Sequence, residues 1–174
     1  AIIGVLAAVA IPQYDVYRRK AISSEAKVAL GAAHAAQKSF SFDQQSFTGC
    51  AFAIGVQPDS NNYYSVGFAM TMAALAVTTA ACGPAGGLAC DRLTYVPVVS
   101  PVADCTAAAN SSWYVGMIVA TGGAASTIAS IPDGVITGPA FTIGAGADIG
   151  GPAGALDQWT IDDTKALRHV MSGF

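Results

Sequence analysis

Cysteine is the residue type with the most evident chemistry in this sequence. The four cysteines are Cys50, Cys82, Cys90 and Cys105. Their spacing contains no Cys-x-x-Cys pair and no nearby histidine pair, which argues against a zinc site. We interpret them as two disulfides of an exported protein, with buried free thiols in a cytosolic protein as the alternative. Of the three connectivities that four cysteines allow, we expect Cys82–Cys90, which closes a small Gly-Pro-rich loop, and Cys50–Cys105, which ties the loop after the N-terminal helix to the sheet.

Sequence motifs of catalysis are missing from the chain. It has no GxSxG, HExxH, P-loop or EF-hand pattern, and its two histidines, His34 and His169, fall on a predicted helix and on the predicted final strand. The stretch GAGADIG, from Gly144 to Gly150, has the spacing GxGxxxG, and no helical pattern follows it. We therefore predict a tight loop at this stretch, no catalytic or cofactor-binding residue, and a protein that is not an enzyme.

Four aspartates late in the chain are the candidates for a metal site: Asp148, Asp157, Asp162 and Asp163. Calcium takes about six to eight oxygen ligands, and these aspartates lack the regular spacing of a calcium loop, so no metal is predicted. His169 is expected to be solvated on the outer face of the last strand. Trp113 and Trp159 are interpreted as packing residues.

The composition indicates a weakly charged surface. Of the 174 residues, 53% are hydrophobic and only 11% are charged, against about 25% charged in ordinary soluble domains. Such a surface suits packing against copies of the same chain. A net charge of −3 argues against a basic face that wraps duplex nucleic acid.

The chain opens on an apolar run, Ala1–Ile11, that no polar residue interrupts. A membrane span needs about 20 residues, so this run is too short to cross a bilayer. Pro12 lacks a backbone donor and kinks a helix without having to end it. Beyond it, apolar residues recur at spacings of three and four, which predicts one helical face; they are Ile22, Ala26, Ala29, Ala33, Ala36 and Phe40.

We therefore predict one long helix over residues 1–42. Residues 1–14 would be a membrane or filament-core segment, residues 15–42 an amphipathic half, and residues 43–174 a globular head. The cationic cluster Arg18–Arg19–Lys20 lies one to two turns beyond the apolar part, where a membrane helix meets lipid headgroups. A solvated helix face explains these charges equally well.

Alternating apolar residues in the head predict a mostly antiparallel sheet. The candidate strands are residues 63–72, 93–99, 113–120 and 140–144, followed by a hairpin of residues 157–162 and 165–170. A helix followed by such a sheet is an α+β arrangement. The helix face is expected to pack on the side of the sheet that bears Val66, Phe68, Val115, Met117 and Trp159.

The N-terminal stretch resembles the N-terminal helix of type IVa pilins. Those proteins carry an apolar segment that ends in a Gly-x-Leu-Ala-Ala-x-Ala-Ile-Pro block, which Gly4, Leu6, Ala7, Ala8, Ala10, Ile11 and Pro12 match position by position. The later SEAK and AQKSF segments and the terminal DQWTIDDTKALRHVMSGF also look like pilin segments. The similarity covers about a third of the chain, and no motif matches its middle.

The resemblance implies a structural subunit that polymerises into a type IV pilus, a surface filament (fimbrium) of identical subunits. Before assembly such a subunit is anchored in the inner membrane, and assembly machinery moves it into the filament, which serves motility, adhesion or DNA uptake. The alternative is a minor pilin or a type II secretion pseudopilin. A separate adhesin or DNA-binding module is a third alternative, and the acidic pI weighs against its nucleic-acid version. The implied filament-core residues are Ile2, Ile3, Gly4, Val5, Leu6, Val9, Ile11, Pro12 and Tyr14.

The resemblance also implies a preceding apolar segment and a change of the helix on assembly. Mature pilins begin roughly ten residues earlier, with an N-methylated Phe and then a Glu, which would bring the apolar run to spanning length. The resemblance further implies that the stretch between Gly4 and Pro12, weak as a helix at both ends, unwinds when the subunit is packed in a filament. In the isolated subunit we expect it to be helical.

Overall fold

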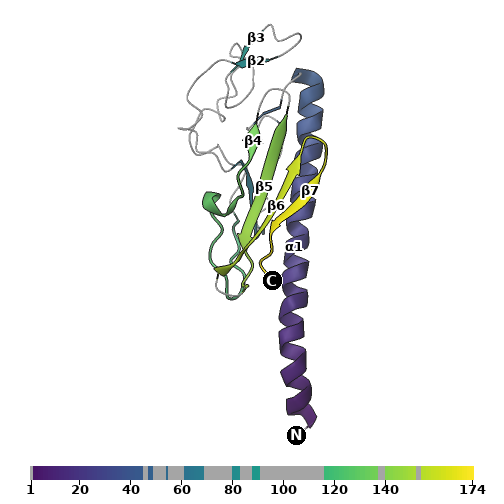
Figure 1. Cartoon of the computed structure of the whole chain (residues 1–174), viewed down its shortest axis with the longest axis vertical. Helices are drawn as coiled ribbons and strands as arrows, with labels where there is room; N and C mark the ends of the chain where they lie inside the picture. Colours follow the sequence, from purple (N-terminus) through teal and green to yellow (C-terminus); the bar gives the residue numbers. More distant parts are fainter. Residues whose placement is uncertain are drawn as a thin grey trace.

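The computed structural model describes residues 2–44, 47–48, 54, 61–68, 80–82, 88–90, 116–136, 140–151 and 154–174. One long helix runs along one side of the molecule, and an antiparallel sheet lies against its C-terminal part (Figure 1). This is the α+β arrangement that the sequence predicts.

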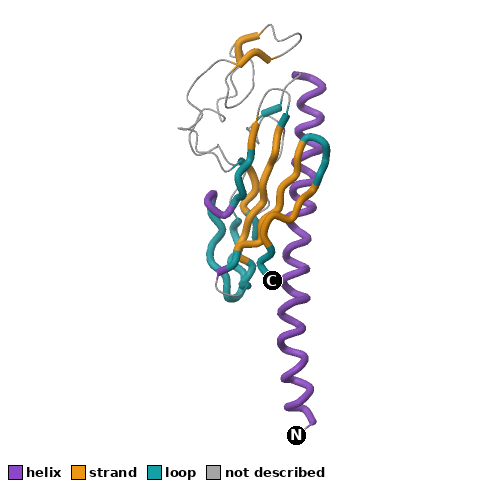
Figure 2. The backbone as a smooth tube through the Cα atoms, in the orientation of Figure 1, coloured by secondary structure: helices purple, strands orange, loops and turns teal. Residues whose placement is uncertain are grey.

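The helix α1 spans Ile2–Gln44, 43 residues, and continues through Pro12 without a break. At about 1.5 Å per residue it is roughly 65 Å long. Its N-terminal part extends beyond the head, whereas its C-terminal part lies along the sheet (Figure 2). The long N-terminal helix that the sequence predicts is therefore confirmed, and the stretch between Gly4 and Pro12 is helical within it.

The sheet packed on α1 is antiparallel throughout. It consists of β1 (Ser65–Gly67), β4 (Val135–Ile136), β5 (Phe141–Asp148), β6 (Leu156–Asp162) and β7 (Leu167–Met171). The order is β1-β5-β6-β7, and β4 pairs with the start of β5, where Ile136 lies opposite Phe141. A short 3-10 helix, η6 (Ile128–Ser130), precedes β4, and a separate hairpin joins β2 (Ala80–Cys82) to β3 (Leu88–Cys90).

The final hairpin is where the sequence places it. Its turn is held by Asp162, whose Oδ1 accepts hydrogen bonds from the Thr164 backbone N–H at 3.0 Å and from the Ala166 N–H at 2.9 Å. Lys165 takes a positive φ of 68° in this turn. An aspartate at the first turn position favours this geometry because its short carboxylate reaches the backbone two residues on.

The core lies between α1 and the sheet. On the helix its fully buried apolar residues are Ala26, Leu30 and Ala33. They pack in one cluster with sheet residues that include Tyr64, Val66, Phe141, Ile143, Ala145 and Ile161. Small helix residues let the backbone approach the sheet, and Leu30 fills the space between them.

The predicted helix face is partly wrong at its C-terminal end. Phe40 is only half-buried and Ala36 likewise, whereas Leu30 and Gln37 are fully buried. Gln37 is tolerated in the core because its side-chain amide pairs with the backbone of Thr48: Nε2 donates to the carbonyl oxygen, and Oε1 accepts from the N–H at 3.1 Å. A buried amide costs little once its hydrogen bonds are made.

The strand predicted over residues 113–120 is wrong for the part that the structure describes, residues 116–120. The backbone N–H groups of Met117 and Ile118 both donate to the carbonyl oxygen of Asn62, which is not a ladder pattern. Met117 and Val119 are exposed and do not face α1. Of the other residues expected on that side, Val66 and Phe68 are buried and Trp159 packs on the core, while Val115 lies outside the described residues.

The predicted tight loop from Gly144 to Gly150 is also wrong, because Gly144–Asp148 is the second half of β5. Ile143, Ala145 and Ala147 face the core, and the alternate glycines face the chain around Ile131. A Cβ at Gly144 would lie 2.8 Å from Ile131 Cγ2, and one at Gly146 would collide with the carbonyl of Ser130. The glycines therefore mark a close approach of two chain segments. The predicted strand at 93–99 lies outside the described residues.

The helix face gives a test of this packing. We expect Leu30→Ala to lower the free energy of unfolding by about 2–5 kcal/mol, because it removes a fully buried side chain. Val28→Ala, at a position that is 73% exposed on the same helix, should change it by less than about 0.5 kcal/mol. Thermal or denaturant melts of the variants measure both; equal effects would contradict the assigned face.

Candidate functional site

The N-terminal part of α1 is an apolar helix that the head leaves uncovered. Its large side chains Ile2, Ile3, Leu6, Val9, Ile11 and Tyr14 are 63–83% exposed, and Tyr17, which the sequence reasoning did not single out, is 67% exposed. Gly4 and Pro12 are exposed as well, and Val5 lies in the same helix. Monomeric soluble proteins rarely expose so large a contiguous apolar surface, which marks it as an interaction surface.

No helix among the described residues holds an apolar stretch long enough to pass through a lipid bilayer.

The cationic cluster is divided between the head and solvent. Arg18 Nη2 donates to Thr121 Oγ1 at 2.8 Å, and Arg19 Nη1 donates to the carbonyl oxygen of Gly150 at 2.9 Å. Only Lys20 of the three is fully exposed. From the sequence we expected these charges to meet lipid headgroups or solvent. Neither interpretation included hydrogen bonds from the arginines to loops of the head.

Glu25 joins the middle of α1 to the chain entering β1. Its Oε1 accepts hydrogen bonds from the backbone N–H groups of Tyr63 at 2.8 Å and Tyr64 at 3.1 Å. An ionised acceptor makes such bonds stronger than neutral ones. The sequence pattern placed Glu25 on the polar side of the helix and gave no sign of this role.

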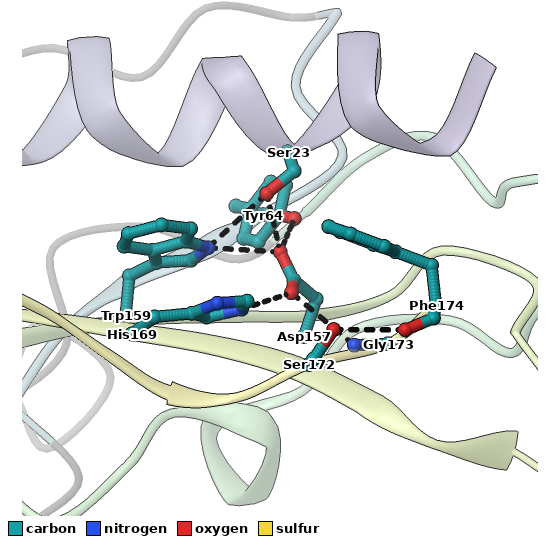
Figure 3. A network of polar contacts seen from close by, with 8 residues as sticks. All are labelled: Ser23, Tyr64, Asp157, Trp159, His169, Ser172, Gly173 and Phe174. Carbon is teal, nitrogen blue, oxygen red and sulfur yellow. Dashed lines mark hydrogen bonds and ion pairs between the residues drawn. The ribbon is translucent and has the colours of Figure 1, made fainter. Parts of the chain in front are cut away.

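The main polar feature of the head is a hydrogen-bond network around Asp157, which we call the Asp157 network (Figure 3). Its Oδ2 accepts from Ser23 Oγ at 2.8 Å, Tyr64 Oη at 2.5 Å and Trp159 Nε1 at 2.9 Å. Its Oδ1 contacts His169 Nε2 at 2.7 Å and the backbone N–H of Gly173 at 3.3 Å. Asp157 itself is fully buried.

His169 belongs to this network, so the expectation that it is merely solvated is wrong. Its ring stacks on Trp159, with centroids 4.0 Å apart and planes 8° from parallel, and its side chain is only 29% exposed. The pairing was not visible in the sequence because it needs two strands in a known register; Trp159 lies opposite His169 in the β6–β7 ladder.

The network fixes the protonation of its two buried acids. Burial favours the neutral form of Asp157, but hydrogen bonds from Tyr64, His169, Ser23 and Trp159 favour the carboxylate, and the net effect lowers its pKa. Burial, together with the neighbouring carboxylate, raises the pKa of Tyr64. Asp157 is therefore the acceptor and the Tyr64 hydroxyl the donor at neutral pH.

A serine, a histidine and an aspartate meet here, but Ser23 and His169 each bind Asp157, in an arrangement that connects structural elements. A nucleophilic serine must reach the histidine that takes its proton. Ser23 instead donates to Asp157 and accepts from Trp159 Nε1 at 3.2 Å. The network therefore joins α1, the residue that precedes β1, the strands β6 and β7, and the chain that follows β7.

The other late aspartates serve separate turns. Asp148 accepts from the backbone N–H groups of Ala124 and Gly150, both at 3.0 Å, and Asp162 holds the β6–β7 turn. Within the part of the chain that the structure describes, no three His, Cys, Asp or Glu side chains gather closely enough to hold a metal ion.

The structure describes two of the four cysteines. Cys82 lies opposite Leu88 and Cys90 opposite Ala80 in the β2–β3 hairpin, so the two cysteines flank one turn. Cys50 and Cys105 lie outside the described residues. Both disulfide pairings remain predictions.

The fold is an α+β arrangement, a long N-terminal α-helix with an antiparallel head, and it is consistent with the pilin fold. No protein-family model matches the chain. A stretch of 64 residues is 42% identical to the Type IV major pilin protein PilA of Myxococcus xanthus (strain DK1622). The match covers 37% of this chain and 29% of that relative. The resemblance to type IV pilins is thereby confirmed for a part of the chain.

The Asp157 network gives a prediction with a defined pH dependence. Asp157→Asn should lower the free energy of unfolding at neutral pH by roughly 3 kcal/mol, since it removes a buried charge that several donors face. Because the folded-state pKa of Asp157 is lowered, its stabilisation is present above the unfolded-state pKa, about 3.9, and is lost as pH falls through the folded-state value.

The difference between parent and variant should therefore shrink in acid. Denaturant melts between neutral and acidic pH measure it, with Asp163→Asn, a half-exposed neighbour of the turn, as the control that leaves the profile nearly unchanged. A pH-independent difference would show that the charge of Asp157 is not what stabilises the network.

Proposed function

We propose that this chain is the structural subunit of a type IV pilus and polymerises with identical copies through the exposed apolar part of α1. The observation that carries the proposal is the row of large apolar side chains from Ile2 to Tyr14, which the subunit's own head does not cover. The partial similarity to a protein named as a type IV major pilin supports it.

The energetics of burial favour assembly. Each fully buried Ile, Leu or Val side chain contributes about 1.5–3 kcal/mol. Burying the five exposed aliphatic residues between Ile2 and Ile11 would then contribute on the order of 10 kcal/mol, comparable to the 4–15 kcal/mol that association costs in lost freedom. Copies packed on more than one side of the helix would add further burial, so a filament is favoured over a dimer.

The remaining parts of the proposal follow from the pilin resemblance. The subunit would be held in the inner membrane before assembly, with a methylated N-terminal residue on a segment preceding Ala1, and pilus assembly machinery would move it into a filament at the cell surface. Motility, adhesion and DNA uptake are the processes that such a filament serves. No sequence-specific nucleic acid partner is proposed, in keeping with the net charge of −3.

Sheared surface filaments distinguish this function from its rivals. A major pilin is the main protein band of such filaments, whereas a minor pilin or a secretion pseudopilin is a trace component or missing. Finding this chain as the main band supports the proposal, and finding filaments made of another protein contradicts it.

The role of the apolar helix can be tested directly. Leu6→Asp should reduce the yield of sheared filaments about tenfold or more, because it buries a charge in the helix contacts between copies. Val135→Asp introduces the same change at a position on the head that is 56% exposed and should leave the yield nearly unchanged. Both variants should keep the parent's melting temperature as subunits; a Leu6→Asp chain that still forms filaments would contradict the assembly role.

The helix between Gly4 and Pro12 gives a second test. In the subunit α1 is continuous through this stretch. Gly costs about 1 kcal/mol and an interior Pro about 3 kcal/mol against Ala in a helix, so this stretch is weak as a helix. In line with the resemblance to type IVa pilins, we expect it to lose its helix when the subunit is packed in a filament, where neighbouring copies pack better on the unwound chain. A filament map that resolves the backbone measures this. Unbroken i to i−4 hydrogen bonds between Gly4 and Pro12 would contradict it.

A further inference from the structure

A small pocket opens between α1 and the C-terminal hairpin, at the level where the apolar helix leaves the head. It has a volume of about 380 Å³ and is lined by Lys20, Ser23, Lys27, Trp159, His169 and Phe174. Lys27 Nζ lies 4.5 Å from the centre of the Trp159 ring. No acidic side chain lines this pocket, so we call it the lysine pocket.

Within the described part of the chain, neither lysine has a carboxylate partner. Among the residues that the structure describes, the one ion pair joins His169 to Asp157. Lys20 and Lys27 are both exposed and lie seven residues apart, so they point to the same side of α1, about 10 Å apart along the helix axis. The Asp157 carboxylate is fully buried and accepts hydrogen bonds from Ser23 and Tyr64. The pocket therefore fits a carboxylate from outside the subunit.

The matching acid is Asp15, the first charged residue of the chain. It is exposed on α1, and the guanidinium groups of the arginines three and four residues later donate to Thr121 and Gly150. Glu25, the next acid along α1, is bound to the backbone of Tyr63 and Tyr64. Among the described residues, Asp15 forms no ion pair.

Asp15 and the lysine pocket face different directions on one helix. At about 100° per residue, Asp15 is turned by roughly 140° from Lys20 and 120° from Lys27. With such an arrangement, two copies do not form both contacts with each other. Each copy presents Asp15 to one neighbour and its lysine pocket to another. Contacts of this head-to-tail kind build rings or open helical filaments.

The lengths of the helix segments allow the contact to form together with apolar packing. Parallel helices bring Asp15 of one copy level with Lys20 or Lys27 of another when they are staggered by about 8–18 Å. The exposed segment from Ile2 to Tyr14 is roughly 18 Å long. Neighbouring apolar segments therefore overlap by about 10 Å at the shorter stagger, which brings Asp15 level with Lys20, and the overlap falls to almost nothing at the longer one.

We infer that the lysine pocket receives the carboxylate of Asp15 from a neighbouring copy of this chain, and that this ion pair sets the axial stagger of the subunits. The inference rests on the proposed filament function and adds the residues that determine its register. Lys20 and Lys27 hold the carboxylate from either side, and the Trp159 ring positions the Lys27 ammonium by a cation–π contact.

Charge reversal with rescue tests the pairing in cells that make the full-length chain. Asp15→Lys alone and the Lys20→Glu/Lys27→Glu pair should each reduce sheared filaments roughly tenfold, because like charges then face each other at every contact. The chain that carries all three reversals should recover most of the parent's yield. Asp43→Lys and Lys165→Glu, at exposed positions away from the pocket, are the matched controls and should leave the yield unchanged.

A cross-link tests proximity without depending on yield. A chain carrying both Asp15→Cys and Lys27→Cys should form an extended ladder of disulfide-linked subunits in sheared filaments, because each copy then has both halves of the contact. Either cysteine alone should give no ladder. Melting curves of the subunits show whether the substitutions disturb folding.

The outcomes separate the two proposals. A parent strain without filaments of this chain contradicts the proposed function itself. Parent filaments together with absent rescue and no ladder overturn the inference, and then binding of the Lys20→Glu/Lys27→Glu chain to phosphatidylglycerol vesicles, compared with the parent, shows whether the pocket serves a lipid headgroup instead. Rescue together with a ladder supports it.

Discussion

The position of the head on the helix depends on one buried negative charge. Placing a carboxylate where no water reaches costs several kcal/mol unless donors surround it. Around Asp157, Ser23 donates from α1 and Tyr64 donates from the position just before β1. Trp159 of β6 and His169 of β7 complete the set. Because each element satisfies part of the same charge, displacing any one of them leaves the others with an under-solvated group. The apolar core between Leu30 and the sheet supplies burial, while this charge specifies a unique arrangement.

The helix α1 serves two environments, and its sequence changes accordingly. Up to Ile11 it has no polar group, and the head leaves it bare; from Arg18 onward it is held through arginine, serine and glutamate contacts and through its alanines and Leu30. The contacts of the second half hold α1 against the sheet. Because α1 is one continuous helix, its first half extends beyond the head and keeps its apolar side chains exposed.

Sequence patterns predicted the parts of the fold that depend on local periodicity. The helix, its passage through Pro12 and the β6–β7 hairpin with its Asp162 turn follow from spacing and turn chemistry alone. The patterns failed where a distant partner decides the outcome. Gly144 and Gly146 have the pattern of a loop, and only the close approach of the chain at Ile131 explains them as part of a strand. Met117 and Val119 alternate like a strand, although no strand among the described residues pairs with them.

The functional residues divide in the same way. The exposed apolar surface was predictable because an unbroken apolar run is a property of the sequence itself. The Asp157 network was not, since its members are scattered from Ser23 to Gly173 and each is ordinary in its local context. Gln37 is similar: only the backbone of Thr48 explains a buried amide at a position where the helical period predicts a polar residue as exposed. Buried polar groups are the part of a fold that local patterns describe least.

The separation of the network's members along the chain imposes an order on folding. Ser23 and Asp157 are 134 residues apart. The hydrogen bond between them therefore closes a loop that contains most of the chain. Contacts of such long range form slowly, and none of them can form while the chain is still emerging. During synthesis, the middle of α1 is therefore without its partners until the β6–β7 hairpin has been made. Until then Ser23 lacks its acceptor Asp157 and the apolar side of Leu30 is uncovered, so the helix and the sheet pack together only once the hairpin is present.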